Sequence, residues 1–83
     1  MPYIDSKLRI KVDLAIDEII RQDVTPDGQL NYLLFSLCKR TIQPSYKNFK
    51  RYIGELEECV AEIRRRLLAP YEDDRMAEHG DIN

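Results

Sequence analysis

The chain has 83 residues, which is the size of one domain. Apolar residues make up 43% of it and charged residues 34%, a balance typical of a soluble helical protein and too apolar for a chain that is disordered throughout. The net charge of −2 selects no class of partner, and no apolar run approaches the roughly 18 residues that a membrane span needs. We also find no signal peptide at the N-terminus, so we expect a cytoplasmic protein.

The first predicted helix covers residues 5–22. Asp5 is suited to cap its N-terminus. Apolar residues then recur at steps of three and four on one face, at Leu8, Val12, Ala15, Ile16, Ile19 and Ile20. Ile10 and Leu14 lie beside this face and widen it, which indicates a second contact surface, such as one for another subunit.

The second predicted helix covers residues 26–42. Thr25 can cap it, Pro26 suits the first helical position, and Asp27 interacts well with the positive end of the helix dipole. Between Leu30 and Cys38 the helix is apolar nearly all round. We therefore expect it to be the most buried element of the fold.

The third predicted helix, residues 45–69, is the longest. Ser45 is suited to cap it, and Pro70 should end or kink it, because proline lacks an N–H and clashes with the carbonyl four residues back. Its apolar face holds Phe49, Ile53, Leu56, Val60, Ile63 and Leu67. A helix of this length, roughly 37 Å, exceeds its partners within one subunit, so we predict a homo-oligomer, with a dimer favoured.

Residues 70–83 leave two alternatives open: a short fourth helix ending near Gly80, or a flexible acidic tail. Residues 1–69 hold 12 Lys+Arg and 10 Asp+Glu, a net charge of +2, whereas residues 70–83 hold one Arg and five acids, a net charge of −4. The sequence thus predicts an all-α domain over residues 1–69, folded as a three-helix antiparallel bundle without strands, followed by this acidic segment.

Several segments resemble a family of short uncharacterised phage and prophage proteins, which carry GELNY in the middle and APYED…ENGDV near the end. Here Gln29 replaces the Glu of the first motif and His79 replaces the Asn of the second. The matching segments are Met1–Ile4, Gly28–Tyr32, Ile53–Gly54, Ala69–Asp73 and Glu78–Ile82. The resemblance implies a small cytoplasmic protein made in an infected bacterial host, and it implies no reaction and no cofactor.

The segment from Lys39 to Tyr52, which we call the basic corner, holds five cations and no acid. Cations beside a helix N-terminus are a mild local cost that a bound phosphate relieves, and aromatic rings nearby can stack on a base. We therefore predict a ligand site for an anionic small molecule, in which a second copy could supply the last residue. The predicted site residues are Tyr46, Lys47, Lys50, Arg51 and Arg65. The alternative is a solvated basic face that binds nothing.

Four carboxylates form the pattern ExxE followed by ExxD, and a fifth, Glu62, shares the helical face of the first pair. This spacing resembles the magnesium-binding signature of all-helical nucleotide pyrophosphohydrolases, in which carboxylates from two helices hold the metal. The residues are Glu55, Glu58, Glu62, Glu78 and Asp81. Gly80 interrupts the second half, where a helical turn is needed. We therefore predict no metal site, no catalytic residues and no enzyme, and expect the glutamates to pair with Arg64–Arg66 or with a neighbouring subunit.

Two main classes of function remain open at this point. In the first, the chain binds and sequesters an anionic small molecule such as a nucleotide signal. In the second, it is a protein- or nucleic-acid-interaction module that acts on a host factor, with nucleic acid less favoured. A metal-dependent nucleotide pyrophosphohydrolase is a remote third alternative.

Overall fold

The computed structural model describes residues 4–80, which form helices and contain no strand. The prediction of an all-α chain is confirmed over this range. The elements are α1 (Ser6–Arg21), α2 (Gly28–Thr41), α3 (Tyr46–Ile63), the π-helical turn η1 (Arg64–Leu68) and α4 (Ala69–His79). Among these described residues, no helix is both long enough and apolar enough to cross a lipid bilayer.

The chain divides into two units at the first turn of α3. One unit ends at Phe49 and contains α1 and α2, and the other begins at Lys50 and contains the rest of α3, η1 and α4. Each unit is described by itself.

Both ends of helix α1 are capped by hydrogen bonds from the residues that flank it. The Asp5 carboxylate accepts from the Lys7 N–H at 2.9 Å, which confirms the predicted cap. At the other end, Asp23 adopts a left-handed conformation with φ of 55°. The Asp23 N–H donates to the Ile20 carbonyl at 3.0 Å and the Val24 N–H to the Ile19 carbonyl at 3.4 Å. These two bonds form a Schellman motif, with Asp in the place usually taken by Gly.

Helix α2 begins two residues later than predicted, and a different residue caps it. The carboxylate of Asp27 accepts from the Gln29 N–H at 2.8 Å, while the Thr25 hydroxyl donates to the same carboxylate at 2.8 Å. Thr25 therefore supports the cap instead of forming it. An ionised carboxylate is the stronger acceptor for a helix amide. The bonds from Gln29 and Thr25 lower the pKa of Asp27 below its ordinary value.

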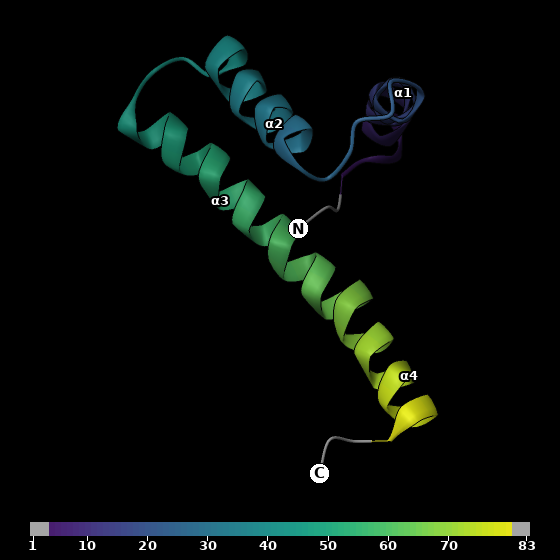
Figure 1. The fold of residues 1–83 in the computed structure, drawn as a ribbon. Coiled ribbons are helices and arrows are strands. Elements are labelled where there is room, and N and C mark those ends of the chain that lie inside the picture. The colour runs from purple at the N-terminus through teal and green to yellow at the C-terminus, as the bar shows by residue number, and fades with distance from the viewer. Residues whose placement is uncertain (1–3, 81–83) are drawn as a thin grey trace. The chain divides into compact units, whose positions relative to one another are not determined.

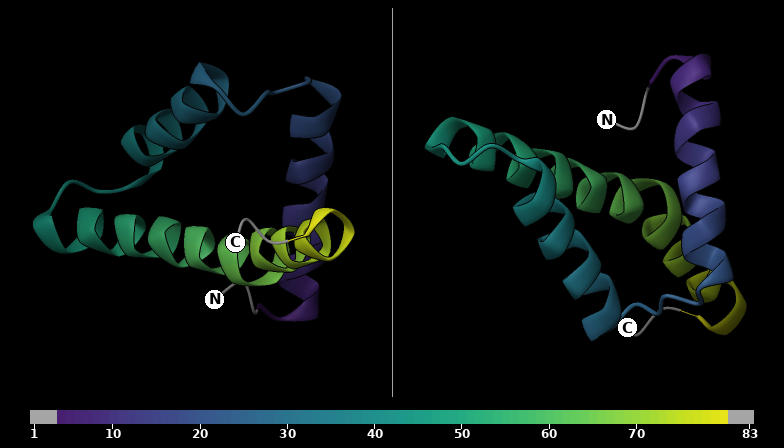
Figure 2. Two further views of the ribbon diagram at one scale, coloured as in Figure 1. Left: turned by 60° about the horizontal axis from the view of Figure 1, so that its bottom comes forward. Right: turned by 90° about the horizontal axis from the view of Figure 1, so that it is seen from above.

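Helices α3 and α4 form one continuous helical segment, so of the two expected effects of Pro70, an end or a kink, the chain does not end its helix there, although the regular α-helical pattern is interrupted by η1 just before it. Figure 1 shows the ribbon of α3 passing into α4 without a break, and the views in Figure 2 show the same continuity. Pro70 is the second residue of α4.

The π-helical turn η1 explains how the backbone passes this proline. The Ala69 N–H donates to the carbonyl of Arg64, five residues back, instead of the usual four. A regular α-helix would place the Pro70 ring against the carbonyl of Arg66. The wider π turn immediately before Pro70 changes the hydrogen-bond register, so the chain continues as helix instead of stopping.

Helix α4 occupies most of the segment for which a helix and a flexible tail were both open. It covers Ala69–His79 and closes at Gly80, whose N–H donates to the Met76 carbonyl at 2.8 Å. Gly80 has φ of 80°, a conformation that side-chain-bearing residues rarely adopt. Residues 81–83 lie outside the described range.

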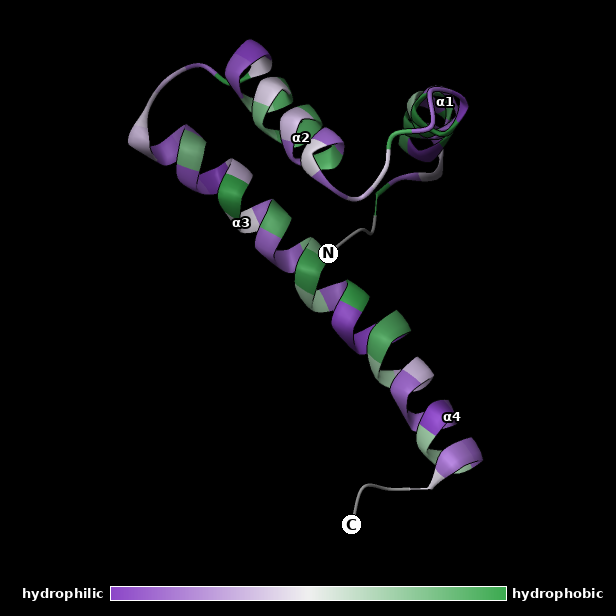
Figure 3. Ribbon diagram, in the orientation of Figure 1, coloured by the Kyte–Doolittle hydropathy of each residue, from purple (hydrophilic) through white to green (hydrophobic). Residues whose placement is uncertain are grey.

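No side chain among residues 4–80 is fully buried in the single chain. In α2, Leu33, Leu34, Ser36 and Cys38 are partly covered, whereas Tyr32 and Phe35 are both 66% exposed. Hydrophobic residues recur along α3 at helical spacing, as Figure 3 shows, and they too stay partly exposed. A helix cannot cover its own apolar face, so each unit presents apolar surface that needs a partner.

Ser45 caps α3 as predicted, and its removal should measurably destabilise the fold. Its hydroxyl accepts from the Asn48 N–H at 3.0 Å, and its carbonyl accepts from the Phe49 N–H at 3.0 Å. We expect Ser45→Ala to lower the free energy of unfolding by about 1 kcal/mol, because one helix amide loses its acceptor. Urea unfolding followed by circular dichroism measures this. Ser36→Ala, within α2, is the control, and an equal loss in both variants would contradict the role of Ser45.

Candidate functional site

Four of the predicted site residues lie together at the start of α3. Tyr46, Lys47, Lys50 and Arg51 fall within about one and a half turns of one helix. All four are exposed, and the Tyr46 side chain is the most exposed of the large apolar and aromatic residues at 81%. The cluster is an open basic surface, in which a ligand would be reached directly from solvent.

The N-terminus of α3 offers fewer free amides than the sequence suggests. The Ser45 hydroxyl already accepts from the Asn48 N–H. The Asn48 side-chain amide in turn donates to the Gln43 carbonyl at 2.9 Å, which ties the connection before the helix to its first turn. Attraction for an anion at this end therefore comes mainly from Lys47, Lys50 and Arg51.

The fifth predicted residue, Arg65, does not join this cluster within one chain. It lies in η1, 14 residues beyond Arg51 along the same helical segment, and this separation corresponds to about 20 Å. Its guanidinium pairs with the Glu62 carboxylate at 2.9 Å, and Arg66 approaches the same carboxylate at 3.8 Å. The expected pairing between the glutamates and Arg64–Arg66 is thus present for Glu62.

Some arginines outside the basic corner pair with acids about one helical turn away. Arg21 pairs with Glu18 at 2.6 Å, and Arg75 pairs with Glu78 at 3.3 Å. By contrast, no acid among residues 4–80 pairs with the cations of the corner, which are Lys39, Arg40, Lys47, Lys50 and Arg51.

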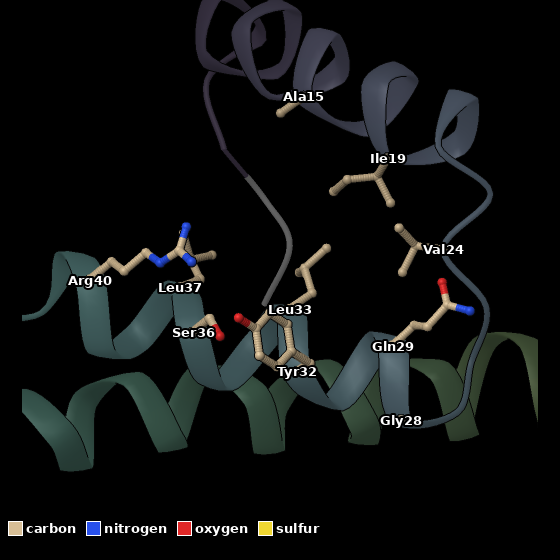
Figure 4. Close-up of a pocket in the computed structure, with 10 residues that line it drawn as sticks. All are labelled: Ala15, Ile19, Val24, Gly28, Gln29, Tyr32, Leu33, Ser36, Leu37 and Arg40. Carbon is tan, nitrogen blue, oxygen red and sulfur yellow. The ribbon is translucent and has the colours of Figure 1, made fainter.

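A groove of about 740 Å³ lies between α1 and α2, and the sequence reading missed it. Its apolar wall includes Ile19 from the last turn of α1, Val24 from the connection that follows, and Leu33 from α2. Figure 4 shows the Ile19 and Val24 side chains close together, the apolar contact that accompanies a Schellman motif. Polar side chains line the other side at helical spacing along α2: Gln29, Tyr32, Ser36 and Arg40.

The C-terminal end of α2 links this groove to the basic corner. Tyr32, Ser36 and Arg40 also line a second, smaller groove, together with Phe35 and Lys39. Arg40 and Lys39 stand in the last turn of α2, where the negative end of the helix dipole favours cations. The unit that ends at Phe49 therefore combines an apolar groove with a basic end. The recurrence of Tyr32, Ser36 and Arg40 at helical spacing was the sequence signal for it.

The carboxylate pattern does not form a metal site in the part of the chain that the structure describes. No group of three or more metal-binding side chains converges among residues 4–80. Glu58 and Glu78 belong to one continuous helical segment and lie 20 residues apart, which is about 30 Å. The two halves of the pattern therefore point from distant turns of one helix, not from two facing helices. Asp81 lies outside the described residues.

No curated protein and no solved structure matches the chain. A family model described as a domain of unknown function, DUF6899, matches residues 1–82. That match covers nearly the whole sequence, including both units and the basic corner. The chain therefore belongs to the DUF6899 family.

Proposed function

We propose that this chain is a small helical binding protein that works as a homo-oligomer and takes an anionic small molecule, such as a nucleotide, at its basic corner. In this proposal the protein sequesters its ligand without catalysis and needs no cofactor. Its setting is the cytoplasm of a bacterium infected by phage, which is what the resemblance to short phage and prophage proteins implies.

The observation that carries the proposal is the group of cations in the corner that have no acidic partner among residues 4–80. Like charges close together on one surface repel, and this repulsion destabilises the folded chain slightly. A bound phosphate would remove the repulsion and accept charge-assisted hydrogen bonds. Binding and stability are therefore coupled in this proposal, so the ligand should stabilise the fold.

The aromatic side chains of the corner suggest a ligand with a flat ring. Tyr46 exposes most of its ring beside Lys47 and Lys50. A base stacks on such a ring regardless of its identity, while phosphates interact with the neighbouring cations. A nucleotide satisfies both kinds of contact with one molecule.

We further infer that the three predicted helices assemble as an antiparallel bundle that a second copy completes. The connections 22–27 and 42–45 are short, and short connections favour antiparallel neighbours. Since residues 4–80 contain no fully buried side chain, a single copy lacks the core that a stable domain of this size needs. Association supplies that core.

The second candidate function is an interaction module that docks on a host protein, and the surface of α1 favours it. Ile10 and Leu14 are each 67% exposed, and Ile20 is 69% exposed. Exposed apolar side chains gathered on one helix are typical of a protein-binding surface. Binding to nucleic acid would instead appear as affinity for duplex that falls steeply with salt.

A thermal-shift comparison tests the first proposal. We expect ATP or a cyclic dinucleotide to raise the melting temperature, because a ligand that binds only the folded chain stabilises it by mass action. Adenosine, which has the ring and no phosphate, is the matched control and should produce little shift. Equal shifts with adenosine and ATP, or none with any nucleotide at millimolar concentration, would contradict an anion site.

A further inference from the structure

We propose that α3 pairs with α3 of a second copy as a parallel two-stranded coiled coil, which brings the two basic corners to one end of the dimer. This inference rests on the homo-oligomer of the proposed function and names its interface. The partner is a second copy of this chain.

The apolar residues of α3 repeat with the spacing of a coiled coil. From Phe49 to Ile63 the successive steps are four, three, four and three residues, a heptad pattern over two heptads of α3. Ile53 and Val60 occupy the first core position of each heptad, called a. The other core position, called d, holds Phe49, Leu56 and Ile63. The pattern stops at η1, where the π turn changes the helical register.

Nothing within the unit that begins at Lys50 can cover this seam, because the described part of that unit is a single helical segment. Val60 is 49% exposed and Ile63 48%.

The residues that flank the seam select the parallel arrangement. In a parallel pair, Tyr52 of one copy lies beside Glu57 of the other, and Cys59 lies beside Arg64, so no like charges meet. In an antiparallel pair, Lys50 would face Arg64 and Glu57 would face its own counterpart. Two like-charge contacts of this kind are unfavourable. The β-branched Ile and Val at the two a positions also favour two parallel strands.

The parallel arrangement determines how the basic corner would be used. Both copies of Lys47, Lys50 and Arg51 stand at the same end of the seam. Lys47 and Arg51 occupy the heptad positions of Ala61 and Glu58, which face away from the seam, so each corner opens to solvent on its own side of the dimer. The expected stoichiometry is one ligand per copy. Arg65 lies about four turns away, outside this site. Only an antiparallel pair would bring it to the corner of the other copy.

Site-specific disulfide formation tests the pairing directly. In a background with Cys38→Ser and Cys59→Ser, Val60→Cys places a thiol at an a position, where the two copies face each other. We expect oxidation to link most of this variant as a dimer on a non-reducing gel. Glu58→Cys, on the outward side of the same turn, is the matched control and should remain largely unlinked.

Three other results would contradict the parallel coiled coil. They differ in whether the homo-oligomer fails with it. If Val60→Cys stays reduced while Leu56→Cys combined with Val60→Cys becomes linked, the pair is antiparallel. If sedimentation shows a dimer that neither variant links, another surface forms the oligomer, and the homo-oligomer survives. If sedimentation shows a monomer at high micromolar concentration, the seam and the homo-oligomer both fail, and ATP binding, measured separately by thermal shift, is then judged on its own.

Discussion

Reversing the charges of Lys50 and Arg51 together should weaken ATP binding at least tenfold, which corresponds to about 1.4 kcal/mol. Both side chains are exposed and belong to the cluster of corner cations that lacks acidic partners among residues 4–80. The variant carries Lys50→Glu and Arg51→Glu. It replaces attraction for phosphate by repulsion at the two central positions of the predicted site. Isothermal titration with ATP at low salt measures the change.

This variant should keep its fold, because acidic side chains near the N-terminus of a helix interact favourably with the helix dipole. Circular dichroism should therefore show unchanged helix content. The matched control is Lys7→Glu with Lys11→Glu on α1, which makes the same change in net charge at exposed positions far along the sequence from the corner. If the control weakens ATP binding as much as the corner variant, the effect is one of overall charge and the corner has no specific role.

Placing a charge within the α3 seam should dissociate the oligomer. We expect Val60→Asp to raise the dissociation constant of the dimer at least a hundredfold, about 2.7 kcal/mol, because each copy would bring an unpaired carboxylate into the interface. Val60 is half exposed in the single chain and occupies a core position of the heptad pattern. Sedimentation equilibrium over a range of concentrations measures the constant.

The neighbouring residue provides a matched control for this prediction. Ala61→Asp adds the same charge one residue later, at an exposed position that faces away from the seam. It should leave the dissociation constant within about threefold of the original, a change of about 0.7 kcal/mol. Equal weakening by both substitutions would show that charge on α3 in general, and not burial at Val60, opposes association.

The sequence by itself determined the features that depend on neighbouring residues. Asp5 and Ser45 were predicted as helix caps, and each accepts the expected backbone hydrogen bond. The all-α content and the apolar face of α3 also followed from steps of three and four residues. These features are predictable because a cap and a helical face involve only residues within a few positions of one another.

Choices between close alternatives could not be made from the sequence. Thr25 was the predicted cap for α2, but the carboxylate of Asp27 is the oxygen that reaches the Gln29 N–H. Likewise, Pro70 was expected to end or kink the helix. It is accommodated because the π turn before it changes the hydrogen-bond register of the preceding carbonyls, and such a turn has no signature in residue spacing.

The groove between α1 and α2 is the feature that only the tertiary structure decided. Ile19 and Val24 meet Leu33 across this groove because the left-handed Asp23 turns the chain out of α1. The groove residues of α2 recur at helical spacing in the sequence. Which residues of α1 lie opposite them depends on the direction of that turn. A surface made by two helices depends on the conformation of the residues that join them, and periodicity within either helix carries no information about that conformation.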